Sequence, residues 1–217
     1  MKIKAVIFDL DGTLINSIEG IAYSMNNVLL RHGFPVHSPE TYKSLVGNGV
    51  KELVRRAVPA DVSEDETNRC LSGMREEYVK NYDYGMAVYD GIEDLLRCLQ
   101  EQGINIAVDT NKDEDVSRRI IGRFLPDFTF SLIMGSRQEI PKKPDPARAR
   151  RIAAQLGILP EQCVYLGDSE VDIMTAKNAG MIPVSAAWGY RKVEDLVSAH
   201  AEHIIKKPME LLNLLHI

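Results

Sequence analysis

The stretch Ile3-Lys4-Ala5-Val6-Ile7-Phe8-Asp9-Leu10-Asp11-Gly12-Thr13 decides the fold of this chain. Its first half is a run of β-branched and aromatic residues, which is typical of a strand buried in a parallel sheet. Similar runs recur at 104–108, 132–134, 164–166 and 182–186, each separated from the next by helix-like sequence. This alternation predicts an α/β fold with a doubly wound, Rossmann-like parallel sheet. Helices are expected at 92–99, at 116–124, from Pro146 to Gly157 and after Pro208.

The first crossover is too long for this pattern. About 90 residues separate Thr13 from the next strand-like run, whereas a simple crossover needs about a dozen. Apolar residues follow helical spacing at 18–29 and 50–57. Ser63 and Glu66 have the spacing of a capping box that opens a third helix, with Leu71, Met74, Tyr78 and Tyr82 on one stripe. The sequence therefore predicts an α/β core at 1–16 and 85–217 and an inserted helical cap at 17–84.

Two carboxylates follow the first predicted strand. Asp9 and Asp11 are two residues apart, so strand alternation points both side chains in the same direction. Ligands of open α/β sheets bind beyond the carboxyl ends of the strands, where this pair is placed. Taken alone, the pair could equally be a helix cap and an Asp-Gly turn.

Polar segments follow the other predicted strands as well. These are Thr110-Asn111-Lys112, Lys142-Lys143-Pro144 and Gly167-Asp168-Ser169, with Asp172 close behind. Because parallel strands end at one edge of a sheet, four strand ends converge on one polar cluster.

With these four segments in order, the chain resembles the haloacid dehalogenase superfamily, and Asp9-Leu10-Asp11-Gly12-Thr13-Leu14 resembles its first motif. The resemblance spans nearly the whole chain and includes a helical cap after the first motif. It implies that Asp9 attacks phosphorus, and that Asp11 first protonates the leaving oxygen and then activates water. It also implies that Asp9, the backbone carbonyl of Asp11, and Asp168 bind Mg²⁺, which hard oxygen ligands favour.

The remaining phosphate contacts follow from the same resemblance. Lys143 would clamp the phosphate and Asp9, while Thr110 and backbone N–H groups near Asn111 and Gly12 would hold the other phosphate oxygens. Asp172 could orient the metal's water shell or cap the following helix. Lys142 is expected to be solvated, because lysine is seldom buried.

The cap contains a candidate substrate loop at 45–53, which resembles that of phosphoglycolate-phosphatase-like members. Asn48 and Lys51 would contact the leaving group, although a plain helix-turn-helix junction fits equally well. A helical lid implies a small phosphorylated metabolite, with 2-phosphoglycolate first. Asn16-Ser17 departs from the Asp-Ser or Asp-Thr pair usual in these relatives.

Several other functions remain open. A pyrophosphatase or nucleotidase would use the same residues, and a β-phosphoglucomutase-like enzyme would return the phosphoryl group instead of releasing it. Asp11 together with Asp168 argues against a haloacid dehalogenase proper. A catalytically inactive binding module would share the fold.

Composition excludes other partners. The net charge is −5 and the 26 Lys and Arg are scattered, so no nucleic-acid or anionic-membrane surface is expected. No apolar run reaches the roughly 20 residues that span a bilayer, and a cytoplasmic enzyme, monomeric or homodimeric, is expected.

Cys70, Cys98 and Cys163 are expected to be free thiols. His200 and His203 have possible metal spacing but run into a strand-like segment.

Overall fold

The computed structural model describes residues 2–137 and 140–215. The chain divides into two compact units, Met1–Asn16 with Val88–Ile217 and Ser17–Ala87, called here the core unit and the helical unit. The second division lies three residues later than the predicted boundary at 84/85. The short strand β3 (Ala87–Val88) spans it and pairs with β2 (Ile15–Asn16).

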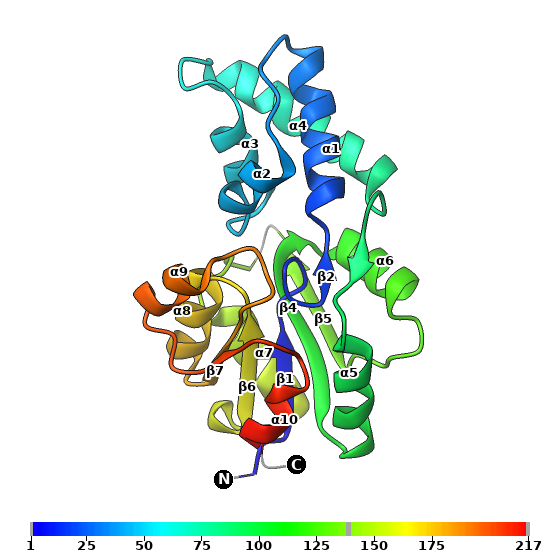
Figure 1. Ribbon diagram of the computed structural model, residues 1–217, viewed down its shortest axis with the longest axis vertical. Coiled ribbons are helices and arrows are strands. Elements are labelled where there is room, and N and C mark those ends of the chain that lie inside the picture. The colour runs from blue at the N-terminus through cyan, green and yellow to red at the C-terminus, as the bar shows by residue number, and fades with distance from the viewer. Residues whose placement is uncertain (1, 138–139, 216–217) are drawn as a thin grey trace. The chain divides into compact units, whose positions relative to one another are not determined.

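A six-stranded parallel sheet forms the core unit (Figure 1). Its strands, in spatial order, are β5 (Leu132–Ser136), β4 (Asn105–Asp113), β1 (Ala5–Phe8), β6 (Cys163–Gly167), β7 (Ile182–Ala186) and β8 (Ile204–Ile205). β1 is central: Phe8 pairs with Val108 on one side and with Leu166 on the other. All four residues of β1 are buried, because both faces of the sheet are covered. The predicted doubly wound parallel sheet is confirmed.

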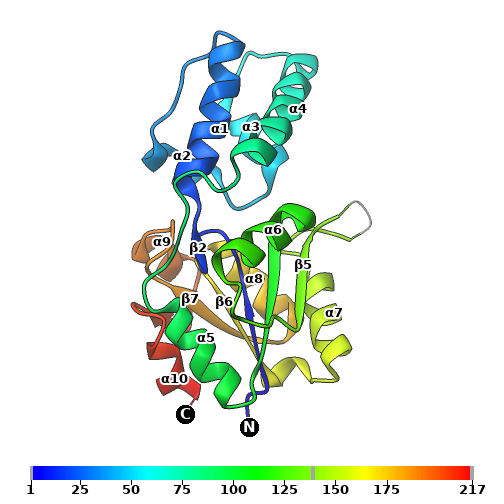
Figure 2. The ribbon, with the colours of Figure 1, turned by 90° about the vertical axis from the view of Figure 1, so that its right-hand side faces the viewer.

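Helices cover both faces of this sheet. They are α5 (Ile92–Glu101), α6 (Glu114–Phe124), α7 (Ala147–Leu156), α8 (Glu170–Ala179), α9 (Val193–Ser198) and α10 (Glu210–Leu215), with a 3₁₀ turn at Pro160–Gln162. Residues of α7 and α8 pack with β1, β4 and β6 in one apolar cluster. α5 lies on the opposite face (Figure 2). The chain runs from β1 through β4 to β5 in one direction across the sheet and then returns to β6 on the other side of β1. Right-handed crossovers therefore place the helices before and after β5 on opposite faces.

One predicted strand end is wrong. β4 continues to Asp113, so Thr110-Asn111-Lys112 lies within the strand and not after it. The physical reason is visible in the pairing. β1 ends opposite Val108, while β4 continues beside β5, where the register shifts between Asp109 and Asp113. The polar segment thus extends beyond the end of β1 in an extended conformation.

The helical unit contains α1 (Ile18–Arg31), α2 (Pro39–Leu45), α3 (Val50–Ala57) and α4 (Glu64–Asn81). The short helix α2 was not predicted, and neither was α9. The buried stripe of α4 runs through Cys70, Met74 and Tyr78 rather than through Leu71. Tyr42 of α2 is fully buried, and its hydroxyl donates to Oδ1 of Asn26 at 2.7 Å.

Only half of the predicted capping box forms at the start of α4. The hydroxyl of Ser63 accepts a hydrogen bond from the backbone N–H of Glu66 at 3.2 Å. The Glu66 carboxylate instead pairs with Arg69 and with His32, the residue that follows α1. Two side-chain partners compete successfully with one backbone N–H, and the carboxylate connects the end of α1 to the start of α4.

All three cysteines are free, as expected, and Cys70 and Cys163 are buried. His200 and His203 belong to neither of the two clusters of three potential metal ligands found within residues 2–137 and 140–215. Over the same residues, no helix combines the length and apolar composition needed to cross a bilayer.

Candidate active site

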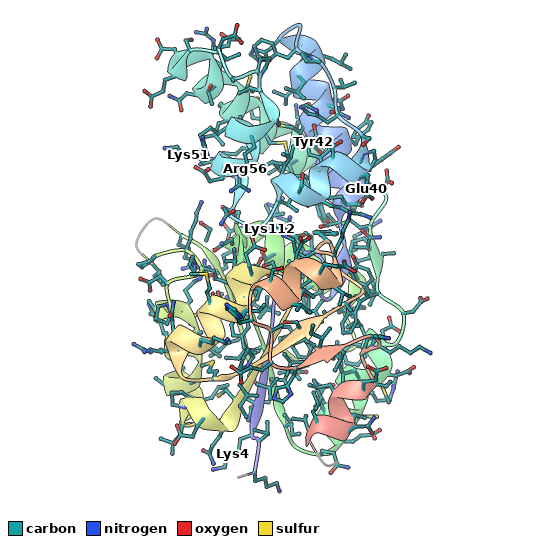
Figure 3. All side chains as sticks on the ribbon, turned by 60° about the vertical axis from the view of Figure 1, so that its left-hand side comes forward. Lys4, Glu40, Tyr42, Lys51, Arg56 and Lys112 are labelled. Atoms are coloured by element: carbon teal, nitrogen blue, oxygen red, sulfur yellow. The ribbon has the colours of Figure 1, made fainter. Side chains whose placement is uncertain are left out.

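The polar segments meet at the carboxyl end of the core sheet. Asp9 follows β1 directly, and its backbone N–H donates to the carbonyl of Leu166 in β6 at 2.9 Å. Figure 3 shows Lys112 at this end of the core unit and Lys4, which precedes β1, at the opposite end. The position of the site therefore follows from the parallel arrangement of the strands.

A tight turn follows Asp9. The backbone N–H groups of Leu14 and Ile15 both donate to the carbonyl of Leu10 at 3.0 Å. Gly12 has a φ of 82°, and a side chain there would collide with the carboxylate of Asp168. Only glycine satisfies both constraints, so Gly12 allows Asp168 to approach the turn.

Lys143 is buried beside two carboxylates. Its Nζ lies 3.0 Å from Oδ1 of Asp9 and 2.6 Å from Oδ1 of Asp172. Burial alone would lower the pKa of Lys143, but the charges of Asp172 and Asp9 outweigh it and raise this pKa. The lysine is therefore a fixed positive charge next to Asp9, where the sequence predicted it.

Asp9, Asp168 and Asp172 form a cluster of potential metal ligands. One oxygen from each carboxylate lies within 4.8 Å of the others. Burial raises the pKa of Asp9 to about 7, even though Lys143 opposes the shift, and it raises the pKa of Asp168 well above its usual range. Neighbouring carboxylates add to both shifts. A hard divalent cation would stabilise the charged form of closely spaced carboxylates whose pKa values are raised. The three residues therefore fit Mg²⁺.

Asp168 is held by the loop after β7. Its Oδ2 accepts a hydrogen bond from the backbone N–H of Tyr190 at 2.7 Å. A side chain at Gly189 would collide with Asp168, so the loop packs directly on this carboxylate. The indole N–H of Trp188 donates to the carbonyl of Thr13 at 3.0 Å and ties the same loop to the turn after Asp9.

Asp172 has two partners. Its Oδ2 accepts from the backbone N–H of Ser169 at 3.1 Å and from the Ser169 hydroxyl at 2.6 Å, which completes a capping box at the start of α8. Its Oδ1 contacts Lys143. The helix-cap interpretation is therefore confirmed, while a role in the metal's water shell stays a prediction. Glu170 lies in the first turn of α8 and pairs with Arg191 at 2.9 Å.

Asp11 has a different neighbour. Its Oδ2 lies 2.8 Å from Nζ of Lys112, whose side chain is only 9% exposed. The charge of Asp11 also contributes to the raised pKa of Asp9, which places the two carboxylates near each other. The roles of acid and base for Asp11 stay predictions.

The predicted phosphate-binding residues differ in their availability. Thr110 is buried, and its hydroxyl accepts from the backbone N–H of Lys112 at 3.2 Å. Oδ1 of Asn111 accepts a hydrogen bond from the backbone N–H of Lys143 at 2.9 Å, and Nδ2 of Asn111 donates to the Lys143 carbonyl at 3.2 Å. The Asn111 amide therefore positions the lysine, and the expected phosphate contact from the Asn111 backbone stays a prediction. Lys142 is half-buried and not fully solvated.

The predicted substrate loop lies in the helical unit, between α2 and α3. Gly47 and Gly49 have φ values of 118° and 85°, which explains the two glycines. Oδ1 of Asn48 accepts from Arg56 at 2.8 Å, and Lys51 is exposed on the first turn of α3 (Figure 3). The helix-turn-helix junction is thus present, and contact of either residue with a substrate stays a prediction.

Sequence reasoning missed several residues that hold the site. These are Asp109, Arg148, Tyr165, Trp188 and Gly189. One signal was available: Arg148 stands on the same helix as the buried, apolar residues Ala149, Ile152 and Ala153. A charge on a buried helix face requires a buried partner.

Comparison with known proteins agrees with this geometry. The model of the family described as haloacid dehalogenase-like hydrolase matches residues 6–186. The chain belongs to this family. Its match covers all the segments that carry the cluster, from Asp9 to Asp172.

Similarity to individual proteins points to one group within this family. The chain is 36% identical over 196 residues to a phosphoglycolate phosphatase from Pseudomonas putida, covering 86% of this chain and 70% of the relative. A crystal structure from Lactobacillus delbrueckii subsp. bulgaricus, assigned to the phosphoglycolate phosphatases, superimposes with a TM-score of 0.94 at 28% identity, covering 99% of each chain. A mutant of CbbY from Rhodobacter sphaeroides, solved with xylulose-(1,5)bisphosphate, has a TM-score of 0.79 at 25% identity and covers 96% of each chain. The chain is thus a phosphoglycolate phosphatase-like hydrolase.

Proposed function

We propose that this enzyme is a Mg²⁺-dependent phosphatase that hydrolyses a small phosphorylated metabolite through an aspartyl-phosphate on Asp9. The observation that carries the proposal is the contact between Lys143 and Asp9 inside a cluster of carboxylates, of which Asp9 is partly buried and the other two are buried. A lysine fixed at 3.0 Å from the nucleophile orients its attacking oxygen and offers a positive charge to the transferring phosphoryl group.

The reaction divides into two displacements at phosphorus. A carboxylate oxygen of Asp9 forms the new P–O bond while the bond to the leaving oxygen breaks, and Asp11 gives that oxygen its proton. Asp11 then takes a proton from water, whose oxygen attacks phosphorus, and phosphate leaves with regeneration of the Asp9 carboxylate. Asp9, the backbone carbonyl of Asp11, and Asp168 would hold Mg²⁺, which supplies charge neutralisation for the phosphoryl oxygens.

We propose 2-phosphoglycolate as the first substrate to test. The support is the name of the curated relative from Pseudomonas putida. The similar CbbY structure, which contains xylulose-(1,5)bisphosphate, supports a second class of candidate substrate, the phosphorylated sugars. A panel of phosphorylated metabolites, pyrophosphate and nucleotides in Mg²⁺ ranks these substrates, and a coupled assay with β-glucose 1-phosphate detects a phosphomutase. Inactivity across the whole panel would contradict the proposal.

The covalent step has its own test. Acid quenching during turnover of a ³²P-labelled ester should trap label on the polypeptide, and Asp9→Asn should abolish it. Asp11→Asn should lower kcat by about a hundredfold or more with a much smaller change in KM, because the lost proton transfer acts in the transition state. Wild-type turnover with no trapped label under rapid quenching would contradict the mechanism.

A further inference from the structure

A charged pair is buried in the core unit behind the site. The side chains of Asp109 in β4 and Arg148 in α7 are both 0% exposed, and Nε of Arg148 lies 2.8 Å from Oδ1 of Asp109. The hydroxyl of Tyr165 in β6 donates to Oδ2 of Asp109 at 3.1 Å. Three elements of the fold therefore meet at one ion pair.

Arg148 also reaches toward the site. Nη2 of Arg148 donates a hydrogen bond to Oδ1 of Asn111 at 2.7 Å. That oxygen also accepts from the backbone N–H of Lys143 at 2.9 Å, while Nδ2 of Asn111 donates to the Lys143 carbonyl at 3.2 Å. Because arginine can only donate, its contact fixes which end of the Asn111 amide faces the Lys143 N–H.

Lys143 is the end of this chain of contacts. Its backbone is gripped by Asn111, and its Nζ lies between Asp9 and Asp172 and 5.8 Å from the centre of the Tyr165 ring. Tyr165 therefore contacts both the lysine and Asp109. A change at Arg148 can therefore act through Asn111 on Lys143, whose Nζ lies beside Asp9.

Stability alone does not require this pair. Replacing a buried ion pair by apolar residues of similar volume is often neutral or stabilising, because burial removes two charges from water. The other buried residues of α7, Ala149, Ile152 and Ala153, are apolar, so an apolar side chain would suit the same helix face.

We propose that Arg148 is a positioning residue: with Asp109 holding its guanidinium, it orients the Asn111 amide and thereby sets the position of Lys143 relative to Asp9. The inference rests on the role proposed for Lys143. It assigns function to two charges that lie outside the predicted site and that touch neither Asp9 nor Asp168 through any contact described above.

The first test compares Arg148→Met with Ile152→Ala, a buried position one turn along the same helix. Both variants should lower the melting temperature. Arg148→Met should also lower kcat by about tenfold or more, because small misplacements of a catalytic group are costly. Exchange of the Lys143 amide, followed by NMR of ¹⁵N-lysine protein, should accelerate about tenfold or more. Ile152→Ala should leave kcat and this exchange rate within about twofold of wild type.

The second test is the double variant Asp109→Leu/Arg148→Met. Removing both charges should restore the melting temperature toward the wild-type value, while kcat stays low and the Lys143 amide stays exposed to exchange. Recovery of kcat together with stability would overturn the proposal, and so would equal losses in Ile152→Ala. Should the wild type hydrolyse no phosphate ester, the proposed function fails, and the exchange measurement still decides whether Arg148 positions Lys143.

Discussion

Nζ of Lys143 lies closer to Asp172, at 2.6 Å, than to Asp9, at 3.0 Å. The same Asp172 carboxylate caps α8 through its other oxygen. One side chain therefore caps the start of a helix and forms an ion pair with the lysine. Asp9 shares the positive charge of Lys143 with Asp172, and the 3.0 Å contact keeps the Asp9 oxygen oriented.

Replacement of Asp172 by Asn tests this relationship. The amide keeps one acceptor but loses the charge opposite Lys143, so we expect a loss of about 2 kcal/mol in stability and a fall in kcat of about tenfold or more. Steady-state kinetics and thermal unfolding measure the two effects. Asp195→Asn, at an exposed first-turn position of α9, is the control. Wild-type kcat in Asp172→Asn would contradict the shared-charge account.

The raised pKa of Asp9 predicts a pH-dependent stability in EDTA. Burial raises this pKa to about 7, whereas the unfolded chain releases the proton near its usual value of 3.8. Between these values the folded state binds more protons than the unfolded state, so stability falls as pH rises through this window and levels off above pH 7. Asp9→Asn removes this dependence. The stability of Asp9→Asn relative to wild type should therefore increase from pH 5 to pH 7 in urea unfolding. A constant difference would refute the shift.

Removal of the metal should abolish turnover. EDTA should reduce hydrolysis to background, and added Mg²⁺ should restore it, because Asp9 and Asp168 otherwise repel the phosphate. Asp168→Asn should raise the Mg²⁺ concentration needed for half-maximal activity by about tenfold or more. Mg²⁺ should also raise the melting temperature of the wild type more than that of Asp168→Asn. Full activity in EDTA would rule out the metal's role.

The loop contact on Asp168 makes a steric prediction. Gly189→Ala places a methyl group against Asp168, so we expect a loss of about 1–3 kcal/mol in stability and weaker Mg²⁺ activation. Gly122→Ala in α6 is the matched control. Nothing lies within 4 Å of the added methyl group there, and the substitution should stabilise the helix by about 0.5–1 kcal/mol. Equal behaviour of the two variants in urea unfolding and Mg²⁺ titration would contradict this prediction.

The sequence predicted what depends on local pattern and strand order. β-branched runs marked the strands, and polar residues after them marked Asp9, Lys143 and Asp168, which the structure brings to one end of the sheet. The parallel topology does most of this, because it places every strand's carboxyl end at the same edge.

What the sequence did not predict depends on contacts between distant segments. The contact of the Asn111 side-chain amide with the Lys143 backbone, 32 residues away, was not predicted, whereas the phosphate contact expected of the Asn111 backbone stays a prediction. Glu66 was assigned to a capping box, but its carboxylate pairs with the side chains of Arg69 and His32 and not with the backbone N–H of Ser63. The extension of β4 past Asp109 follows from pairing with β5, which no local pattern encodes.

The central position of β1 has a consequence for biosynthesis. Ala5 pairs with Asn105 on one side and Cys163 on the other, so the strand that precedes Asp9 leaves the ribosome long before either neighbour exists. Its apolar residues must stay unpaired while the helical unit, a single continuous segment at Ser17–Ala87, can already fold. Such an exposed strand is prone to intermolecular association until the later strands arrive. Slowing translation beyond residue 163 should therefore matter less for soluble yield than slowing it before residue 105.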